Sequence, residues 1–332
     1  MTKETTVVVA GASGLVGSNV TKVLLSNGYR VRATMRDHNA ADKVPYLMAL
    51  PGAGERLELM SADMGDEGAF DAALQGADCV FITCLAPTYF GPSGKPAREM
   101  DDAQGYAEII MPTVNGCLNI LRSAARNGVS NAVICSSTSS TNPQPPVPVK
   151  NEIDHWSDID AQCRAKKYTS ATKTVMEKAA MSLTTDAGIR LSILLPTLML
   201  GPVFMPQHLF GTYQSMFAKM IDGEPPRHEK VPNDSISMIH IDDISALMVA
   251  AYENPQAEGR YFGVKDSWHW KDIYAELGKL IPEATMPAPL TDSPAKPTTF
   301  DFSRRDSLGV PLRDVPAILR ETVEWIRTKP FG

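Results

Sequence analysis

Apolar and polar residues alternate in blocks along the first part of the chain, and these blocks predict strands separated by helices. Short apolar runs predict strands at residues 5–10, 29–36, 56–64, 78–83, 131–137 and 189–196. Longer mixed stretches between them predict helices at 13–28, 68–76, 107–128 and from 164 to about 187. Strands that alternate with helices are typical of a parallel sheet. We therefore predict an α/β fold with a doubly wound parallel sheet of the Rossmann type.

The pattern changes after Pro196, where prolines become more frequent and the predicted helices shorter. We expect a dinucleotide-binding core at 1–196 and, at 197–332, mainly a smaller C-terminal substrate lobe that is interleaved with the core. Met and Phe cluster between residues 199 and 220. This segment is either the core of the lobe or one wall of a hydrophobic substrate pocket. Tyr89 and Phe90, in the loop after the strand at 78–83, would then supply the opposite wall.

Three glycines at the end of the first predicted strand form a GxxGxxG motif. Glycines at this spacing allow a tight turn and bring the backbone close to a pyrophosphate at the helix N-terminus. A glycine-rich turn without a ligand is the alternative, but the strand before the motif and the helix after it favour a dinucleotide site. The residues that we expect to contact the cofactor here are Gly11, Ser13, Gly14, Leu15, Val16 and Gly17.

The end of the second predicted strand selects between NAD and NADP. Arg36 can offer a planar pair of donors to a 2′-phosphate, and Lys43 adds a second positive charge. Asp37 is the counter-evidence, because an acid turned towards the ribose serves NAD. We predict NADP. Further contacts are expected at the carboxyl ends of strands and on the helix that follows residue 164, where ligands bind in open α/β sheets: Asp63, Met64, Thr83, Leu85, Lys173 and Pro196.

Composition excludes several classes of partner. The formal net charge of −6 gives no reason to expect nucleic acid or an anionic membrane surface. No apolar run approaches the roughly 18 to 20 residues of a membrane span, and a strand begins too early for a signal peptide. We expect a cytoplasmic protein. The five cysteines and six histidines show no metal-ligand spacing, and both a monomer and a homodimer stay open.

Several motifs in a fixed order resemble the extended short-chain dehydrogenase/reductases, and among them the dihydroflavonol reductase and cinnamoyl-CoA reductase group. The similar stretches are VRATMRD, MPTVNGCLNIL, VICSSTSSTN, LPTLMLGP and SMIHIDDIS. The resemblance implies hydride transfer between a nicotinamide and a carbonyl carbon. It also implies a tyrosine that donates the proton, a lysine that holds the ribose, and a serine that hydrogen-bonds the carbonyl oxygen. Matching the motifs puts the lysine at Lys173 and the serine at Ser137, with Ser136 as its near neighbour.

The stretch RAKKYTSATKTVMEKAA departs from that pattern, because Tyr168 and Lys173 are five residues apart instead of four. Residues five apart on a straight helix point about 140° from one another, whereas residues four apart are within about 40°. Three interpretations follow. Tyr168 could reach the site from an irregular first turn, which is the assignment we prefer; Thr169 could fill its place as a poor acid; or the reductase chemistry could be lost.

Together these features predict an NADPH-dependent reductase of a hydrophobic, aromatic or cyclic, ketone or aldehyde, with Ser137, Tyr168 and Lys173 as catalytic residues. A coenzyme A thioester is disfavoured because Lys95 and Arg98 are the only basic residues expected near the pocket mouth. The alternatives are a protein that binds NADP(H) on the same fold without reducing a substrate, and an epimerase or dehydratase.

Overall fold

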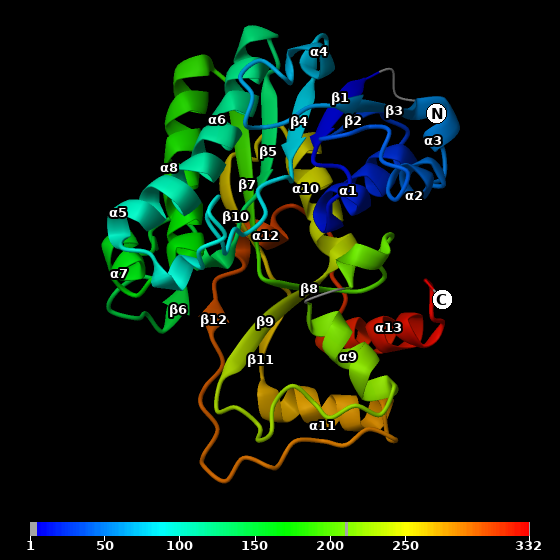
Figure 1. Ribbon diagram of the computed structural model, residues 1–332, viewed down its shortest axis with the longest axis vertical. Coiled ribbons are helices and arrows are strands. Elements are labelled where there is room, and N and C mark those ends of the chain that lie inside the picture. Colours follow the sequence, from blue (N-terminus) through cyan, green and yellow to red (C-terminus); the bar gives the residue numbers. More distant parts are fainter. Residues whose placement is uncertain (1–4, 210–211, 332) are drawn as a thin grey trace.

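The computed structural model describes residues 5–209 and 212–331, and its centre is a parallel sheet (Figure 1). The strand order is β10-β7-β5-β4-β1-β2-β3, with every neighbouring pair parallel. This order confirms the predicted doubly wound α/β fold. The strands are β1 (Thr6–Ala10), β2 (Arg30–Met35), β3 (Leu57–Ser61), β4 (Cys79–Ile82), β5 (Asn131–Cys135), β7 (Arg190–Pro196) and β10 (Gly259–Gly263).

Helices cover both faces of the sheet because its central strands are apolar on both sides. All four residues of β4 are buried, and so are the last six residues of β7. One face packs against α1 (Leu15–Ser26) and α10 (Ile241–Glu253), the other against α6 (Met111–Arg126) and α8 (Tyr168–Ala187). The remaining short helices of this part are α2 (Val44–Met48), α3 (Ala53–Arg56), α4 (Asp71–Leu74), α5 (Asp102–Gly105) and α7 (Ile159–Arg164). Since α10 and β10 lie beyond residue 196, the second half of the chain also builds the core.

The C-terminal lobe lies below the carboxyl ends of the strands in Figure 1 and has a hydrophobic core of its own. Met216, Phe217 and Met220 are buried in this core, so these members of the Met/Phe segment pack the lobe. Residues 210 and 211 of the same segment lie outside the described residues. The elements of the lobe and its edge are β8 (Leu198–Leu200), β9 (Ser235–His240), β11 (Asp266–His269), α9 (Tyr213–Ile221), α11 (Trp270–Leu280), α13 (Val315–Arg327), α12 (Ser303–Asp306) and the pair β6 (Val149–Lys150) and β12 (Thr299–Phe300).

Two predicted helices differ from their observed form, and both differences lie near the candidate site. The helix expected from residue 164 is interrupted: α7 ends at Arg164, Lys166 has a left-handed φ of 57°, and α8 begins at Tyr168. The helix expected from residue 107 begins earlier, as α5, and continues into α6 through a π-helical turn at Tyr106–Ile110. A π turn accommodates one extra residue, and such turns are frequent near functional sites.

Candidate active site

A pocket of about 480 Å³ lies at the carboxyl ends of β1 to β4. Predicted cofactor residues contribute much of its wall: Gly11, Ser13, Gly14, Arg36, Lys43, Asp63, Met64 and Thr83. Cys84, at the end of the strand that we expected to pass under the cofactor, also lines the pocket. The other residues of the wall that the described residues form were not expected there: Met35, Ala62, Phe70, Ala86, Gln207 and His208. The pocket therefore joins segments far apart in the sequence at the edge where open α/β sheets bind ligands.

The glycine loop at one end of this pocket has the shape that a pyrophosphate requires. Gly11 has φ of 89°, and an added Cβ would lie 2.7 Å from the Cβ of Cys84. An added Cβ on Gly17 would collide with the Gly11 carbonyl oxygen, so Gly17 serves the close packing of α1 on the strand. The first turn of α1 holds no acidic side chain, and Gly14 caps it without a side-chain hydrogen bond. Its backbone N–H groups are thus available to an anion, and the residues present fit a bound dinucleotide.

Arg36 and Lys43 lie on the same pocket wall, whereas Asp37 does not line it. The Asp37 carboxylate instead accepts a hydrogen bond from the backbone N–H of Asn39 at 2.9 Å. Within the described part of the chain, neither Arg36 nor Lys43 forms an ion pair. This arrangement leaves two positive charges for a 2′-phosphate. The Asp37 carboxylate, which would favour NAD if it faced the ribose, does not line the pocket.

The structure does not bring every predicted cofactor residue to this wall. Leu15, Val16 and Gly17 lie in the first turn of α1, with Val16 and Gly17 buried, and Pro196 ends β7. Leu85 is also buried, and its carbonyl accepts a hydrogen bond from Lys173. None of these positions lines the pocket, so their contact with the cofactor stays a prediction.

Lys173 occupies a buried position on α8 beside the carboxyl end of β4. Its side chain is 6% exposed, and the amine donates to the Leu85 carbonyl at 2.6 Å. Burial lowers the pKa of the Lys173 amine, while Cys135 and then Glu177 act in the opposite direction. The lysine therefore has few solvent contacts and depends on its neighbours to stay protonated.

Tyr168 points away from Lys173, contrary to the preferred sequence assignment. Its side chain is 0% exposed, and its hydroxyl donates to the Asp102 carboxylate at 2.8 Å and accepts from the Lys166 amine at 3.0 Å. Gly105 leaves space for the ring, because an added Cβ there would come within 2.6 Å of Tyr168 Cδ2. Since α8 is regular from Tyr168 onwards, its first turn contains no irregularity that would swing the phenol towards the lysine.

Thr169 lies four residues before Lys173 and so shares its face of α8. Its hydroxyl donates to the Thr88 carbonyl at 2.6 Å. This contact ties the start of α8 to the loop after β4, and Thr169 lines a second pocket together with Tyr89 and Phe90. The structure thus places a short aliphatic hydroxyl where the regular spacing would place a phenol.

Ser136 and Ser137 follow β5 and point to different partners. The Ser136 hydroxyl donates to the buried Glu177 carboxylate through a short hydrogen bond. Ser137 is half-buried, and its oxygen accepts from the backbone N–H of Ser139 at 3.2 Å. Because Ser137 retains its own hydroxyl hydrogen, it is the member of the pair that is free to donate to a ligand.

The loop after β8 brings Gln207 and His208 over the glycine motif. His208 donates from Nε2 to the Ser13 carbonyl at 3.1 Å, since a carbonyl can only accept. Burial lowers the pKa of His208, so the ring is neutral at physiological pH. No local sequence signal marks these two residues, because their position depends on how the lobe docks onto the core.

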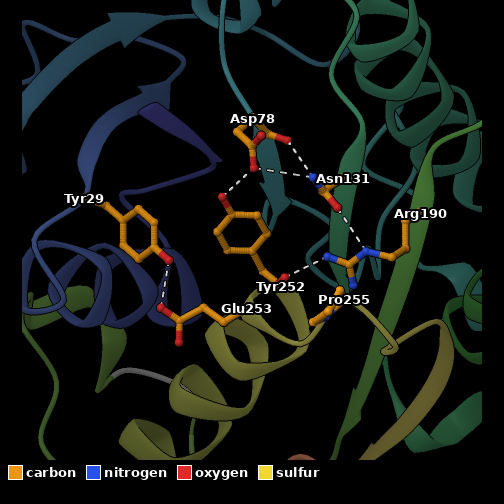
Figure 2. Close-up of a pocket in the computed structure, with 7 residues that line it drawn as sticks. All are labelled: Tyr29, Asp78, Asn131, Arg190, Tyr252, Glu253 and Pro255. Carbon is orange, nitrogen blue, oxygen red and sulfur yellow. Dashed lines mark hydrogen bonds between the residues drawn. The ribbon is translucent and has the colours of Figure 1, made fainter. Parts of the chain in front are cut away.

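A different pocket, of about 650 Å³, lies at the opposite, amino-terminal end of the strands (Figure 2). Here Arg190 donates to four carbonyl groups near the C-terminal end of α10 and to the Asn131 side chain. The hydroxyl of Tyr252 donates to Asp78 at 2.5 Å, and that of Tyr29 to Glu253 at 2.7 Å. The polar groups bind one another and terminate a helix, which is a structural role.

Residues 5–209 and 212–331 bring together no group of three or more His, Cys, Asp or Glu side chains that could hold a metal ion. In the same ranges, none of the helices has both the length and the apolar character needed to cross a bilayer.

The glycine loop, the basic pair and the buried lysine on α8 define a dinucleotide-binding protein of the Rossmann class. The chain belongs to the NAD dependent epimerase/dehydratase family, whose model matches residues 7–263. It is 31% identical to a cinnamoyl-CoA reductase from Medicago truncatula, over 98% of this chain and 97% of the relative. It is 32% identical to a dihydroflavonol 4-reductase from Zea mays, over 93% of this chain and 84% of the relative. The predicted resemblance to this reductase group is confirmed.

The same fold occurs in the yeast methylglyoxal/isovaleraldehyde reductase that was solved in complex with NADPH. That structure matches 98% of each chain with a TM-score of 0.78 and 18% sequence identity. At this identity the match concerns the fold.

Proposed function

We propose that this protein uses NADPH to reduce the carbonyl group of a hydrophobic ketone or aldehyde whose apolar part is aromatic or cyclic. The chain is an NADP-dependent oxidoreductase that acts on carbonyl groups, since relatives that match nearly the whole chain are named as reductases. The Arg36 and Lys43 side chains on the pocket wall support the same cofactor.

The observation that carries the substrate proposal is the second pocket, of about 440 Å³, on the outer side of the loop after β4. Tyr89 and Phe90 line it, and each is 60% exposed although large and aromatic. The same loop borders the cofactor pocket, because Cys84 and Ala86 line that pocket. An apolar ring held by Tyr89 and Phe90 would lie beside the cofactor site, and a substrate would cover the exposed aromatic surface.

Acidic partners of the basic residues at this pocket support a free ketone or aldehyde over a coenzyme A thioester. Lys166 and Lys167 line it beside Arg98, whereas Lys95, the other basic residue expected near its mouth, does not. However, Lys166 pairs with Asp102 at 3.0 Å, and Arg98 lies 3.7 Å from Glu99. Among these three cations, Lys167 alone lacks an acidic partner within the described residues. One free cation is a poor match for the several phosphate charges of a coenzyme A group.

The residues of the site have distinct roles in this proposal. NADPH, when bound, supplies the hydride. Ser137 donates a hydrogen bond to the substrate carbonyl oxygen, where negative charge develops. The Lys173 amine binds the ribose hydroxyls, and Thr169 holds the loop that carries Tyr89 and Phe90. Because an alkyl hydroxyl is a poor acid, the proton of the product alcohol comes from water in the open pocket.

A second candidate function follows from the orientation of Tyr168. With its phenol bound to Asp102 and Lys166, the protein lacks the usual proton donor in the pocket. A protein that binds NADPH for a regulatory purpose, and reduces nothing, would have the same geometry.

Consumption of NADPH with a panel of aryl and cyclic ketones and aldehydes tests the proposal. The sharpest variant is Thr169→Tyr, which puts a phenol four residues before Lys173. A positioned general acid contributes about 10²- to 10⁴-fold, so we expect Thr169→Tyr to raise kcat at least about tenfold. Thr169→Phe, of the same size but without a hydroxyl, is the matched control and should give no increase. If wild type and Thr169→Tyr bind NADPH but reduce none of the compounds, the second candidate function is correct.

A further inference from the structure

A buried ion pair lies one helical turn beyond Lys173 on α8. Glu177 on α8 and Arg260 on β10 have side chains 0% and 2% exposed, and Glu177 Oε2 lies 2.9 Å from Arg260 Nε. Removing two charges from water is costly, and well-packed apolar residues often stabilise a core as well as such a pair does. The location of the pair therefore needs an explanation beyond stability.

Glu177 connects two candidate site residues. It lies four residues after Lys173 and thus one turn further along the same face of α8. Its Oε1 accepts the Ser136 hydroxyl, which fixes the strand end immediately before Ser137. Burial raises the pKa of Glu177, while the guanidinium of Arg260 and the Ser136 hydroxyl oppose that rise. Loss of this carboxylate would leave an uncompensated guanidinium near the Lys173 amine.

The other titratable groups that face Lys173 are Cys84 after β4, Cys117 on α6 and Cys135 on β5. Burial raises the pKa of Cys84 to about 12 and that of Cys135 to about 11, and it raises the pKa of Cys117 still further. These thiols are neutral at physiological pH. Glu177 is consequently the one acidic group in this set that can keep the amine charged.

Arg260 organises the segment that follows Ser137. Its guanidinium donates to the carbonyls of Glu152 and His155 and to the Ser140 carbonyl and hydroxyl. It also stacks on the Trp156 ring, with 3.6 Å from Cζ to the ring centroid. One side chain thus fixes both ends of the loop that begins at Ser137.

We propose that Glu177 and Arg260 are positioning residues of the reductase: Glu177 keeps the Lys173 amine charged, and Arg260 holds the loop that presents Ser137. This inference rests on the proposed function for its Ser137 part. Its Lys173 part concerns cofactor binding alone and can be tested without any carbonyl substrate.

The first test compares the NADPH dissociation constants of the wild type and Glu177→Gln across the pH range. The fluorescence of the bound nucleotide reports the binding. Affinity in the wild type should fall as pH rises and the Lys173 ammonium loses its proton. In Glu177→Gln the fall should move to lower pH by about one unit, because a neutral amide no longer opposes the charge of Arg260. Asp243→Asn is the matched control: it removes another buried carboxylate that pairs with an arginine, Arg313, and should leave the midpoint unchanged.

The second test is Arg260→Lys, which keeps the positive charge but loses the planar set of donors. We expect kcat to fall at least about tenfold, with the NADPH dissociation constant and its pH midpoint unchanged. This variant tests the Ser137 part of the proposal even if Glu177→Gln does not fold. An unshifted midpoint in Glu177→Gln, or full kcat in Arg260→Lys, would overturn the proposal. A shifted midpoint in a protein that reduces no carbonyl compound would instead reject the proposed function and keep the role of Glu177.

Discussion

One extra residue between Tyr168 and Lys173 determines where the phenol lies. The five-residue spacing excludes a shared helical face by simple geometry, and the structure shows the consequence. Tyr168 is buried against Gly105 and bound to Asp102 and Lys166, while Thr169 shares the face of Lys173. The sequence predicted this conflict but not its outcome, because the outcome depends on space left by a glycine more than 60 residues away.

His240 provides a residue-scale prediction of pH dependence. It is 1% exposed, its Nδ1 accepts from the Asp242 N–H at the start of α10, and burial, assisted by Arg313, lowers its pKa to about 4. The unfolded chain takes up this proton near pH 6.5, so the stability conferred by the neutral ring is complete above that value and is lost as pH falls towards 4.

We therefore expect the free energy of unfolding of the wild type to drop by about 2 kcal/mol between pH 7 and pH 5 through His240 alone. His240→Asn keeps an N-cap acceptor without a titratable ring and should lose correspondingly less over the same interval. Urea unfolding of both proteins at the two pH values measures the difference. Equal losses in the two proteins would show that His240 does not titrate as described.

At the scale of elements, apolar periodicity predicted the sheet well because its central strands are buried on both faces. Runs such as residues 78–83 and 189–196 leave little choice but a buried strand, and β4 and β7 lie within them. A later or irregular start of this helix was one of the interpretations, but the position of the break between α7 and α8 was not predicted. Lys166 is neither glycine nor asparagine, and nothing local signals its left-handed φ of 57°. The π turn before α6 was not predicted either.

The junction between α5 and α8 gives an element-scale prediction. Gly105 has helical dihedral angles, so an alanine there would by itself favour the helix. Because its Cβ would collide with the Tyr168 ring, we expect Gly105→Ala to destabilise the fold by about 1 to 3 kcal/mol in urea unfolding. Gly54→Ala in α3 is the control, because an added Cβ there meets nothing within 4 Å. A stable Gly105→Ala protein would show that Tyr168 does not occupy this space.

At the scale of the molecule, we propose that the choice between NADP and NAD depends on two positive charges beyond β2, Arg36 and Lys43. Charge-assisted hydrogen bonds contribute about 1.5 to 3 kcal/mol each. We therefore expect Arg36→Ala with Lys43→Ala to weaken NADPH binding at least about 100-fold and to leave NADH binding nearly unchanged, as measured by calorimetry. Asp37→Ala, which removes a side chain outside the pocket wall, should alter neither. A large loss of NADH affinity in Asp37→Ala would mean that the acid contacts the ribose.

The pocket residues that depend on how the lobe docks onto the core were the hardest to predict from the sequence. The glycine motif, Arg36 and Lys43 were predicted because each follows a strand whose end is marked in the sequence. Gln207 and His208 line the same pocket from beyond β8, and only the tertiary arrangement brings them there.

We propose that this reductase works without the phenol of Tyr168. The most direct test is the rate of NADPH consumption by Tyr168→Phe with the best carbonyl substrate of the wild type. We expect a kcat within about threefold of the wild type, because the lost hydroxyl contacts Asp102 and Lys166 and takes no part as a general acid. A fall of about 100-fold or more in a folded protein that still binds NADPH would contradict it and make Tyr168 the proton donor.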